Sequence, residues 1–558
     1  MKKTLIIIGA VIVLILIVLI ALPMFVDVNK FKPTLQTEIS SAIGRQVTIG
    51  NISLAIFSGG VSIDNLSISD DPAFSHSAFL TAKQLTVGVD LLGLIFSQKL
   101  AVRSFTISDP EVALIRNAPG TAWNFSSLAS GSGSAPKSKA SSSGPSAATN
   151  LSVEKLVISN GRITMSTAGS HAKPQVYEAV NLEASDLSYT TQFPFHMSAK
   201  TPGNGAVKLD GKAGPINQAD AAQTPLSAKI DVQHLDVAAT GFVNPAAGIA
   251  GFVDFAGDVS SDGKQAQAKG VVKVQKLKAS PSGSPATVPV EVDFAADYDL
   301  KRQGGDVRQG DVHIGKALAR LTGSYNLAGE EPTIQMKMNG QGMSVPDLEG
   351  ILPAVGVNLP TGARLESGTL DTNLSISGAV DKLTITGPVK MANAKLAGFS
   401  AGSKLGALGS FTGLGGGSKG SDTEIQTFSA DIRQDPTGTH AENLDVVVPS
   451  IGTITGTANV TPKGDLDCHM SAKLSGGGPA SEVTGGISKL AGGGSSKSGG
   501  GIPFLVKGTT SVPIFLPDVA GMAEGLAKNP AGALGAAGAV ADTPTKALGG
   551  LLGKKKSQ

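Results

Sequence analysis

The sequence predicts a mainly β protein: an elongated, curled antiparallel β-sheet that forms a groove, with an N-terminal transmembrane helix and a few short helices. Apolar and polar residues alternate in short runs over most of the 558 residues, as they do in strands with one apolar face. Aromatic residues make up only 4% of the chain, whereas glycine occurs 71 times. An unbroken apolar run near the N-terminus predicts the transmembrane helix.

The composition excludes several classes of protein. No Gly-X-Y period accompanies the abundant glycine, which excludes collagen, and an apolar fraction of 41% excludes a fully disordered chain. The net charge of +2 lacks the basic excess of nucleic-acid-binding proteins, so we expect no nucleic-acid partner. The single cysteine, Cys468, permits neither an intrachain disulfide nor a cysteine-rich zinc site.

The first expected element is a membrane anchor. Residues 5–22 are 18 consecutive uncharged residues, and as a helix they would span about 27 Å of a hydrocarbon core of about 30 Å. A cleaved signal peptide is the alternative, but its apolar region is shorter, and Pro23 and Met24 make a poor cleavage site. We therefore expect a retained anchor with the body of the chain facing away from the cytoplasm. Representative anchor positions are Leu5, Ile12, Leu16 and Leu22.

A short helix is expected over 29–43, because Asn29 suits its N-terminal cap and Gly44 its C-terminal end. The residues that recur at helical spacing on one face are Leu35, Ile39, Ala42 and Ile43. Two interpretations of this face stay open: the helix lies on the membrane, or it packs against the first strands.

Alternation with a period of two begins at Val47. Its phase slips by one residue at Asp64 and Asn65, which predicts a turn or a β-bulge there. Alternation then continues, punctuated by turn residues, over most of the remaining chain. The apolar residues that we expect to line a lipid groove are Val61, Ile63, Leu85, Val87, Val207, Leu209, Val272, Val274, Ile334, Met336, Met338, Leu374, Ile376, Leu383 and Ile385.

Composition divides the chain into five segments. The anchor occupies 1–25, and a first β domain with its short helix occupies 26–128. Residues 129–150 contain no large apolar side chain, which predicts a flexible linker. A repetitive β body with Gly/Ser-rich loops follows over 151–516. The last segment, 517–558, is expected to form a short helix and a basic tail that is either frayed or in contact with an anionic surface.

The apolar faces of so many strands must be shielded from water by other parts of the protein or by a ligand. Two packed sheets usually fill the space between them with large aromatic side chains, but the inward candidates here are mostly Val, Ile, Leu and Met. A curled sheet would instead leave an apolar trough, and exposed apolar surface of that size normally marks a binding site. An acyl chain matches such a trough, so phospholipid or another acyl lipid is the expected ligand. A closed, dry core is the alternative.

No catalytic, cofactor-binding or metal-binding motif is recognisable. The seven histidines show no H-E-x-x-H spacing, and no Walker-type phosphate loop occurs. Residues 416–420 match G-x-S-x-G by letters only, because they lie in a low-complexity tract without a strand-to-helix elbow. We therefore expect no enzyme activity, and an anchored hydrolase is the least favoured alternative. Cys468 alternates with Leu466 and Met470, as a small core residue would.

Several phrases of the sequence together resemble one known family. They are FVDVNKFKPTLQTEISSAIGRQVTIGNISLAIFSGGVSIDNLSISDDPAF at 25–74, LTVGVDLLGLIFSQKLAVRSFTISDPEVALIRNAPGTAWNF at 85–125, GPVKMANAKLAGF at 387–399 and IPFLVKGTTSVPIFLPD at 502–518. With the preceding anchor, they resemble the AsmA family.

The AsmA resemblance implies an inner-membrane protein whose body lies in the periplasm of a Gram-negative-type bacterium. The family is similar to bridge-like lipid transfer proteins with a hydrophobic β groove, and it is linked to outer-membrane biogenesis. It is also linked to outer-membrane protein assembly and to protein targeting to membranes. The expected function is a conduit that moves phospholipid between the inner and outer membranes. The alternative is an envelope assembly factor that binds other envelope proteins without transporting lipid.

Overall fold

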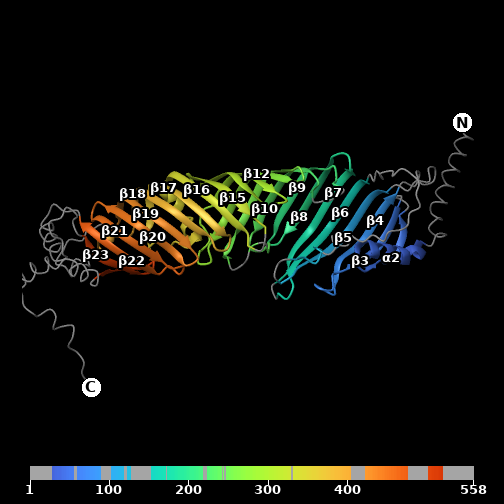
Figure 1. Ribbon diagram of the computed structural model, residues 1–558, viewed down its shortest axis with the longest axis horizontal. Coiled ribbons are helices and arrows are strands. Elements are labelled where there is room, and N and C mark those ends of the chain that lie inside the picture. Colours follow the sequence, from blue (N-terminus) through green and yellow to red (C-terminus); the bar gives the residue numbers. More distant parts are fainter. Residues whose placement is uncertain are drawn as a thin grey trace, which may run out of the picture. The chain divides into compact units, whose positions relative to one another are not determined.

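The protein, described here from a computed structural model, is mainly β (Figure 1). The structure describes residues 28–55, 60–89, 102–118, 122–126, 153–170, 173–217, 223–241, 243, 247–328, 331–403, 421–474 and 501–518. No helix within these ranges is long and apolar enough to span a membrane. The predicted anchor over 5–22, the linker over 129–150 and the tail beyond Asp518 lie outside the described residues, and the division into five segments stays a prediction.

The described residues contain few helices and many long strands. The helices are η1 (Val28–Phe31), α2 (Lys32–Ile43), α5 (Val345–Glu349) and η5 (Leu352–Val355). The first twelve strands are β1 (Val47–Thr48), β2 (Ile52–Ala55), β3 (Gly60–Ser69), β4 (Ala78–Val89), β5 (Val102–Arg116), β6 (Val153–Thr167), β7 (Gln175–Leu187), β8 (Phe193–Thr201), β9 (Gly205–Ala213), β10 (Leu226–Asp236), β11 (Ile249–Ser261) and β12 (Gln265–Ala279). The others are β13 (Val290–Asp299), β14 (Gly304–Ile314), β15 (Ala317–Asn326), β16 (Thr333–Ser344), β17 (Arg364–Ala379), β18 (Thr384–Ala397), β19 (Thr423–Asp435), β20 (Gly438–Val448), β21 (Gly452–Val460), β22 (Leu466–Leu474), β23 (Ile502–Gly508) and β24 (Pro513–Pro517).

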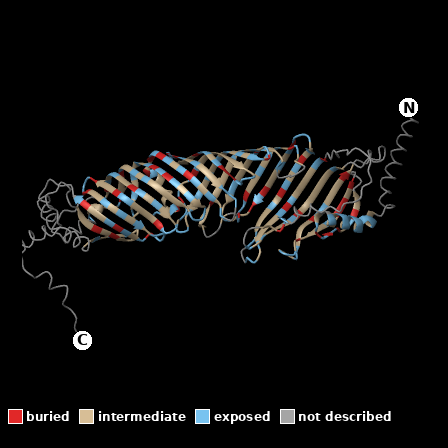
Figure 2. Cartoon of the chain, viewed as in Figure 1, coloured by how far each residue is buried: buried red, intermediate tan, exposed pale blue. Residues whose placement is uncertain are grey.

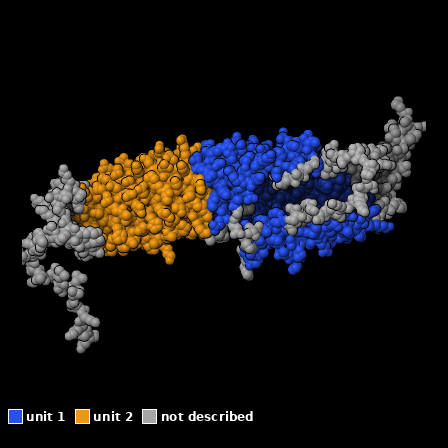
Figure 3. Space-filling model, viewed as in Figure 1, with its two compact units in different colours: residues 1–277, 289–310, 322–333 blue, residues 278–288, 311–321, 334–558 orange. Residues whose placement is uncertain are grey.

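The chain forms two compact units, which Figure 3 colours separately. Unit 1 consists of Met1–Leu277, Pro289–Gly310 and Thr322–Thr333. Unit 2 consists of Lys278–Val288, Asp311–Leu321 and Ile334–Gln558. Each unit is built on a curled, mainly antiparallel sheet, which confirms the predicted fold class.

Strands of unit 1 pair in the order of the sequence. Both β1 and β2 pair with β3, and from β3 to β11 each strand pairs with the next. All of these pairs are antiparallel except β5 with β6, which is parallel. A parallel pair needs a crossover connection of about a dozen residues or more. The connection here contains the predicted linker over 129–150, which is long enough for such a crossover.

Left-handed residues interrupt the strands of unit 1. Asn65 has a φ of 52° and separates the part of β3 that pairs with β2 from the part that pairs with β1, so the predicted phase slip is confirmed. Asn160 and His234 are also left-handed. Their backbone N–H groups donate to side-chain oxygens on the next strand, to Asn181 at 2.9 Å and to Asp254 at 2.8 Å. Such irregularities increase the twist of a strand and therefore help the sheet to curl.

Helix α2 covers the first strands of unit 1. Gly44 ends it with a φ of 70°, as predicted, because glycine tolerates the left-handed conformation. Ile39 and Ile43 pack against a buried cluster that includes Val47 and Ile49. The interpretation that this helix packs against the first strands is therefore confirmed.

Two predicted details of this helix are wrong. Asn29 does not cap α2; its Oδ1 accepts the Ile52 N–H at 2.9 Å and its Nδ2 donates to the Ile52 carbonyl at 3.1 Å, so it fastens η1 to β2. Leu35 does not join the packed face and is 36% exposed. The reason is that the Gln36 side chain donates to the Val47 carbonyl at 3.2 Å, which turns that side of the helix inward and Leu35 outward.

Within unit 2, each strand from β17 to β24 is antiparallel to the next. Thr361 precedes β17, and Ser511 lies in the turn between β23 and β24. The Thr361 N–H and hydroxyl both donate to the Ser511 carbonyl, at 2.9 and 3.1 Å. This part of the sheet therefore curls until the segment before β17 reaches the turn before β24.

Buried side chains form several small clusters in the described residues. One cluster of unit 1 consists of Val47, Ile49, Ile52 and Ile63. Two clusters of unit 2 consist of Ala317, Ala319 and Met343, and of Cys468, Ala472, Phe504 and Val506. Between such clusters most strand residues are only partly buried, as the tan bands of Figure 2 show.

Candidate functional site

One face of the unit 1 sheet carries a continuous row of apolar side chains. Residues that pair directly across neighbouring strands point to the same side of the sheet. From β3 to β10 every strand contributes one apolar residue in register. We call this series the unit 1 row; it consists of Ile63, Leu85, Ile107, Ile158, Leu182, Met197, Leu209 and Ile230.

The unit 1 row is accessible along most of its length. Ile63 is buried under α2, whereas the other seven side chains are half-buried. Large aliphatic residues in a closed core are usually fully buried. Figure 3 shows unit 1 hollowed on one face. Unit 1 therefore presents a lined apolar face rather than a sealed core.

The opposite face of the same strands is polar. Positions next to the unit 1 row include Glu183, His196 and Asp210. The Lys155 ammonium lies 2.6 Å from the Glu183 carboxylate, and the His196 ring lies 2.6 Å from the Asp210 carboxylate. The hydrogen bond from Lys155 lowers the pKa of Glu183. Because these pairs are exposed, water screens them and they add little to stability; they mainly keep this face in water.

Unit 2 repeats the same division of faces. Its apolar row consists of Leu370, Met391, Phe428, Val446, Ile454, Ala472 and Ile502. A row on the opposite face consists of Ser375, Thr386, Arg433, His440, Asn459 and Asp467. All members of the second row are polar. The alternation therefore determines, for every strand from β17 to β22, which side chains lie on the apolar face and which lie on the polar face.

Many of the predicted lining residues form direct cross-strand pairs of two apolar side chains. These pairs are Val61 with Val87, Ile63 with Leu85, Val207 with Val232, Leu209 with Ile230, Val272 with Val292, Val274 with Val290, and Ile376 with Ile385. On β16, Met336 is buried and Ile334 and Met338 are half-buried, and Leu374 is buried on β17. Leu383 lies one residue before β18 begins. Contact of these residues with lipid stays a prediction.

The comparison with protein-family models identifies the family. The model of the AsmA family matches residues 1–329, which is more than half of the 558 residues. The chain belongs to the AsmA family. No curated protein and no solved structure matches it. The matched part of this AsmA family protein contains α2 and the whole unit 1 row, so the apolar face lies within the region that defines the family.

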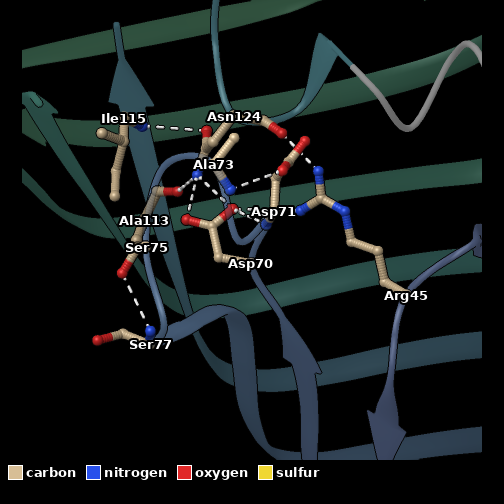
Figure 4. Close-up of polar contacts among 9 residues, drawn as sticks. All are labelled: Arg45, Asp70, Asp71, Ala73, Ser75, Ser77, Ala113, Ile115 and Asn124. Atoms are coloured by element: carbon tan, nitrogen blue, oxygen red, sulfur yellow. Dashed lines mark hydrogen bonds and ion pairs between the residues drawn. The ribbon is translucent and has the colours of Figure 1, made fainter.

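A buried polar network near the start of this AsmA chain is not apparent from the sequence (Figure 4). Asp70 directly follows β3, and its side chain is 0% exposed. Its carboxylate accepts a hydrogen bond from Arg45 at 3.2 Å and two from the Asn124 amide, at 3.0 and 2.9 Å. The Arg45 guanidinium also donates to the Asn124 carbonyl at 2.5 Å and lies 5.3 Å from the centre of the Phe79 ring.

This Arg45–Asp70–Asn124 network joins three segments that are far apart in the sequence. Arg45 follows α2, Asp70 follows β3, and Asn124 follows β5. The Asn124 side chain further donates to the Ala113 carbonyl at 2.8 Å and accepts the Ile115 N–H at 3.0 Å. A buried charge is stable only when it is paired and hydrogen-bonded, so the network holds α2 and the first strands in one arrangement. The quoted phrases that resemble the family contain all three residues, but nothing in their spacing shows that they meet.

Possible metal ligands and Cys468 are the remaining chemically notable residues in the described ranges. No group of three His, Cys, Asp or Glu side chains there is placed to hold a metal ion. Cys468 is 5% exposed in the cluster with Phe504 and Val506, which confirms that it is a core residue. Burial raises the pKa of its thiol, so this thiol is a poor nucleophile at neutral pH.

Proposed function

We propose that this AsmA family protein is a non-enzymatic lipid conduit. It is anchored in the inner membrane by residues 5–22, has its body in the periplasm, and moves phospholipid between the inner and outer membranes in support of outer-membrane biogenesis. Membership of the AsmA family is consistent with a lipid-transfer or envelope role. The observation that carries the proposal is the unit 1 row, in which seven consecutive strands offer half-buried apolar side chains in register.

The geometry of the row suits transport better than storage. Each methylene of an acyl chain gains about 0.8 kcal/mol when it leaves water, so a chain laid against the row is held. Neighbouring strands lie about 4.8 Å apart and offer similar side chains, so no strand holds the chain much more tightly than the next. The polar headgroup would stay in water at the open side. A lipid can therefore move along the row in small steps.

An envelope assembly factor is the second candidate, and one observation favours it. On β24, Ile514 and Leu516 point to the face that is polar elsewhere in unit 2, and they are 50% and 42% exposed. Val512, just before the strand, is 62% exposed on the same side. An exposed apolar patch of this kind suits a protein partner, such as an unfolded outer-membrane protein.

Photo-crosslinking in cells tests the conduit directly. A photo-reactive side chain would replace Leu182 or Leu209 in unit 1 and Ile376 in unit 2. The controls are their sequence neighbours Glu183, Lys208 and Ser375, which are exposed. After illumination, mass spectrometry of the purified protein should find phospholipid on the first set and little on the controls, because the two sets lie on opposite faces of the sheet.

Other outcomes of this crosslinking experiment would contradict the conduit. Absence of lipid from all six positions would mean that the apolar faces are dry. Capture of envelope proteins at Ile514 or Leu516, together with dry apolar rows, would favour the assembly factor. Equal capture on both faces would show non-specific contact with membranes rather than a lipid-filled groove.

A further inference from the structure

Two large apolar side chains at the N-terminal end of helix α2 do not pack on the buried cluster under the helix. Ile39 and Ile43 face the buried cluster under the helix. Phe31 is 62% exposed and Leu35 is 36% exposed. Phe31 is the last residue of η1 and precedes α2, and Leu35 lies about one turn further along the chain. We call Phe31 and Leu35 the outer pair.

The position of the outer pair in the chain indicates what covers it. The apolar run over 5–22 ends nine residues before Phe31, and nine residues span at most about 30 Å when fully extended. If the run crosses a bilayer, Phe31 is held close to its surface. Lys30 is exposed beside it, and a lysine next to an aromatic residue suits the headgroup region, where the ring enters the acyl boundary and the ammonium meets phosphate.

We propose that α2 is a membrane-docking helix whose outer pair, Phe31 and Leu35, inserts into the interfacial region of the bilayer that holds residues 5–22. This inference rests on the anchorage included in the proposed function. Ile39 and Ile43 pack on a cluster that includes Ile63, and Leu85 packs against the same cluster. Docking therefore places the β3–β4 end of the unit 1 row at the membrane surface, where a lipid can pass from the bilayer to the row.

The Arg45–Asp70–Asn124 network supports this geometry. Arg45 directly follows the glycine that ends α2, and it is tied to residues after β3 and after β5. A docked helix would pull on its junction with the sheet, and a paired, buried charge resists that displacement. The network thus fixes the orientation of α2 relative to the first strands, and docking of α2 would fix the orientation of these strands relative to the bilayer surface.

Fluorescence quenching by brominated lipids tests the docking. The full-length protein would be reconstituted into vesicles of phosphatidylethanolamine and phosphatidylglycerol, with Trp123→Phe as background because Trp123 is the only tryptophan. Phe31→Trp and Leu35→Trp should give blue-shifted emission that lipids brominated near the headgroup end of the acyl chain quench. Thr37→Trp is the matched control, since Thr37 is exposed on another side of the same helix, and it should be neither shifted nor quenched.

The variant Leu16→Trp separates failure of the docking from failure of the anchor. If its indole is quenched by deeply brominated lipids while the indoles of Phe31→Trp and Leu35→Trp stay unquenched, the anchor holds and the docking is wrong. Blue-shifted emission of Phe31→Trp without quenching would mean that a protein partner or a second copy covers the outer pair, which also overturns the docking. If the indole of Leu16→Trp itself is not quenched, the anchorage and the docking both fail.

A double variant tests the consequence for lipid entry. Phe31→Ser with Leu35→Ser changes two side chains that do not pack on the buried cluster, so its circular dichroism should match that of the unchanged protein. Lipid capture by a photo-reactive group at Leu85 should fall several-fold, while quenching of the indole introduced by Leu16→Trp is retained. Undiminished capture at Leu85 would show that lipid reaches the row without the docked helix. Capture at Leu182 in the unchanged protein tests the conduit independently.

Discussion

Single residues decide whether α2 and the first strands hold together, and Asp70 is the most important of them. The side chains of Arg45 and Asp70 are 5% and 0% exposed. We expect Asp70→Asn to destabilise unit 1 by about 3–5 kcal/mol, because it removes the carboxylate that pairs with the buried Arg45 guanidinium. Trp123 adjoins Asn124 in sequence, so its fluorescence reports this region. The urea midpoint followed by that signal should fall by about 1 M or more.

A matched control for Asp70→Asn is Glu154→Gln. Arg103 lies 3.7 Å from Glu154, and both side chains are more than half exposed. Loss of this pair should change stability by less than about 1 kcal/mol, because water screens exposed charges. If the two variants unfold at the same urea concentration, the buried network contributes no more to the free energy of unfolding than a surface ion pair does. The inference that the network holds α2 in place on the sheet would then lose its support.

The same residues show which contacts a single sequence can predict. Alternation predicts that Leu209 and Lys208 face opposite sides, and the structure confirms it, because the two-residue period of a strand is local. Arg45 and Asn124 are in contact although 79 residues separate them, and no local period links them. Pairs of this kind are created by the tertiary fold, so they can be found in a single sequence only after the strands have been placed.

At the scale of elements, β24 is an edge strand that pairs only with β23 among the described residues, and prolines protect its free edge. In the β23–β24 pair the N–H groups of Val512 and Asp518 bond to β23 and the turn that follows it. Along an antiparallel strand, backbone N–H positions point alternately toward the paired strand and away from it. The backbone nitrogens of Pro513, Phe515 and Pro517 therefore point away from β23, toward the free edge. Two of these three have no N–H group. Prolines on an edge strand hinder the addition of another strand, so a partner at this end would have to use the apolar face.

Removal of these two prolines should cause self-association. The double variant Pro513→Val with Pro517→Val restores two outward N–H groups on a strand with apolar side chains, and we expect concentration-dependent oligomers in sedimentation velocity experiments. Pro513→Lys with Pro517→Lys restores the same N–H groups but adds charges that oppose edge pairing, so it should stay monomeric. If the valine variant also stays monomeric, the prolines do not protect the edge.

Elements differ in how far the sequence reveals them. Long strands and the glycine end of α2 are predictable, because their signals extend over several residues or need one special conformation. Helix α5 has five residues, too few to display a helical period, and no pattern predicts it. Asn29 suits the cap of α2 by its type, but an asparagine side chain bonds to any nearby backbone, and here β2 offers its Ile52 groups instead. Short elements and caps therefore depend on neighbours that the sequence does not identify.

At the scale of the whole molecule, the division into an apolar and a polar face extends beyond the part matched by the family model. That match ends at residue 329, yet the strands from β17 to β22 alternate in the same way as those of unit 1. Such a face needs few aromatic residues, because its side chains line an open surface and do not have to fill the space between two packed sheets. The low aromatic content of 4% is thus explained by apolar faces that are mostly half-buried in both units.

A conduit requires the row to be continuous, and one charge in it should interrupt transport. Leu182→Asp places a carboxylate in the middle of the unit 1 row, where a lipid chain would have to pass it at a cost of about 3 kcal/mol, roughly a hundredfold in occupancy. Photo-reactive groups at Leu85 and at Leu209 lie on either side of the change. If lipid enters from the α2 end, capture at Leu85 should persist and capture at Leu209 should fall strongly.

The control for Leu182→Asp places the same charge on the other face. Ser198→Asp lies on β8 beside Met197 and points away from the row, so it should leave capture at both probes unchanged. Circular dichroism must show that both variants are folded. Equal capture at Leu209 in Leu182→Asp and in the unchanged protein would mean that lipid reaches each strand separately from solvent or membrane. The row would then be a set of independent binding surfaces, and directional movement along it would be refuted.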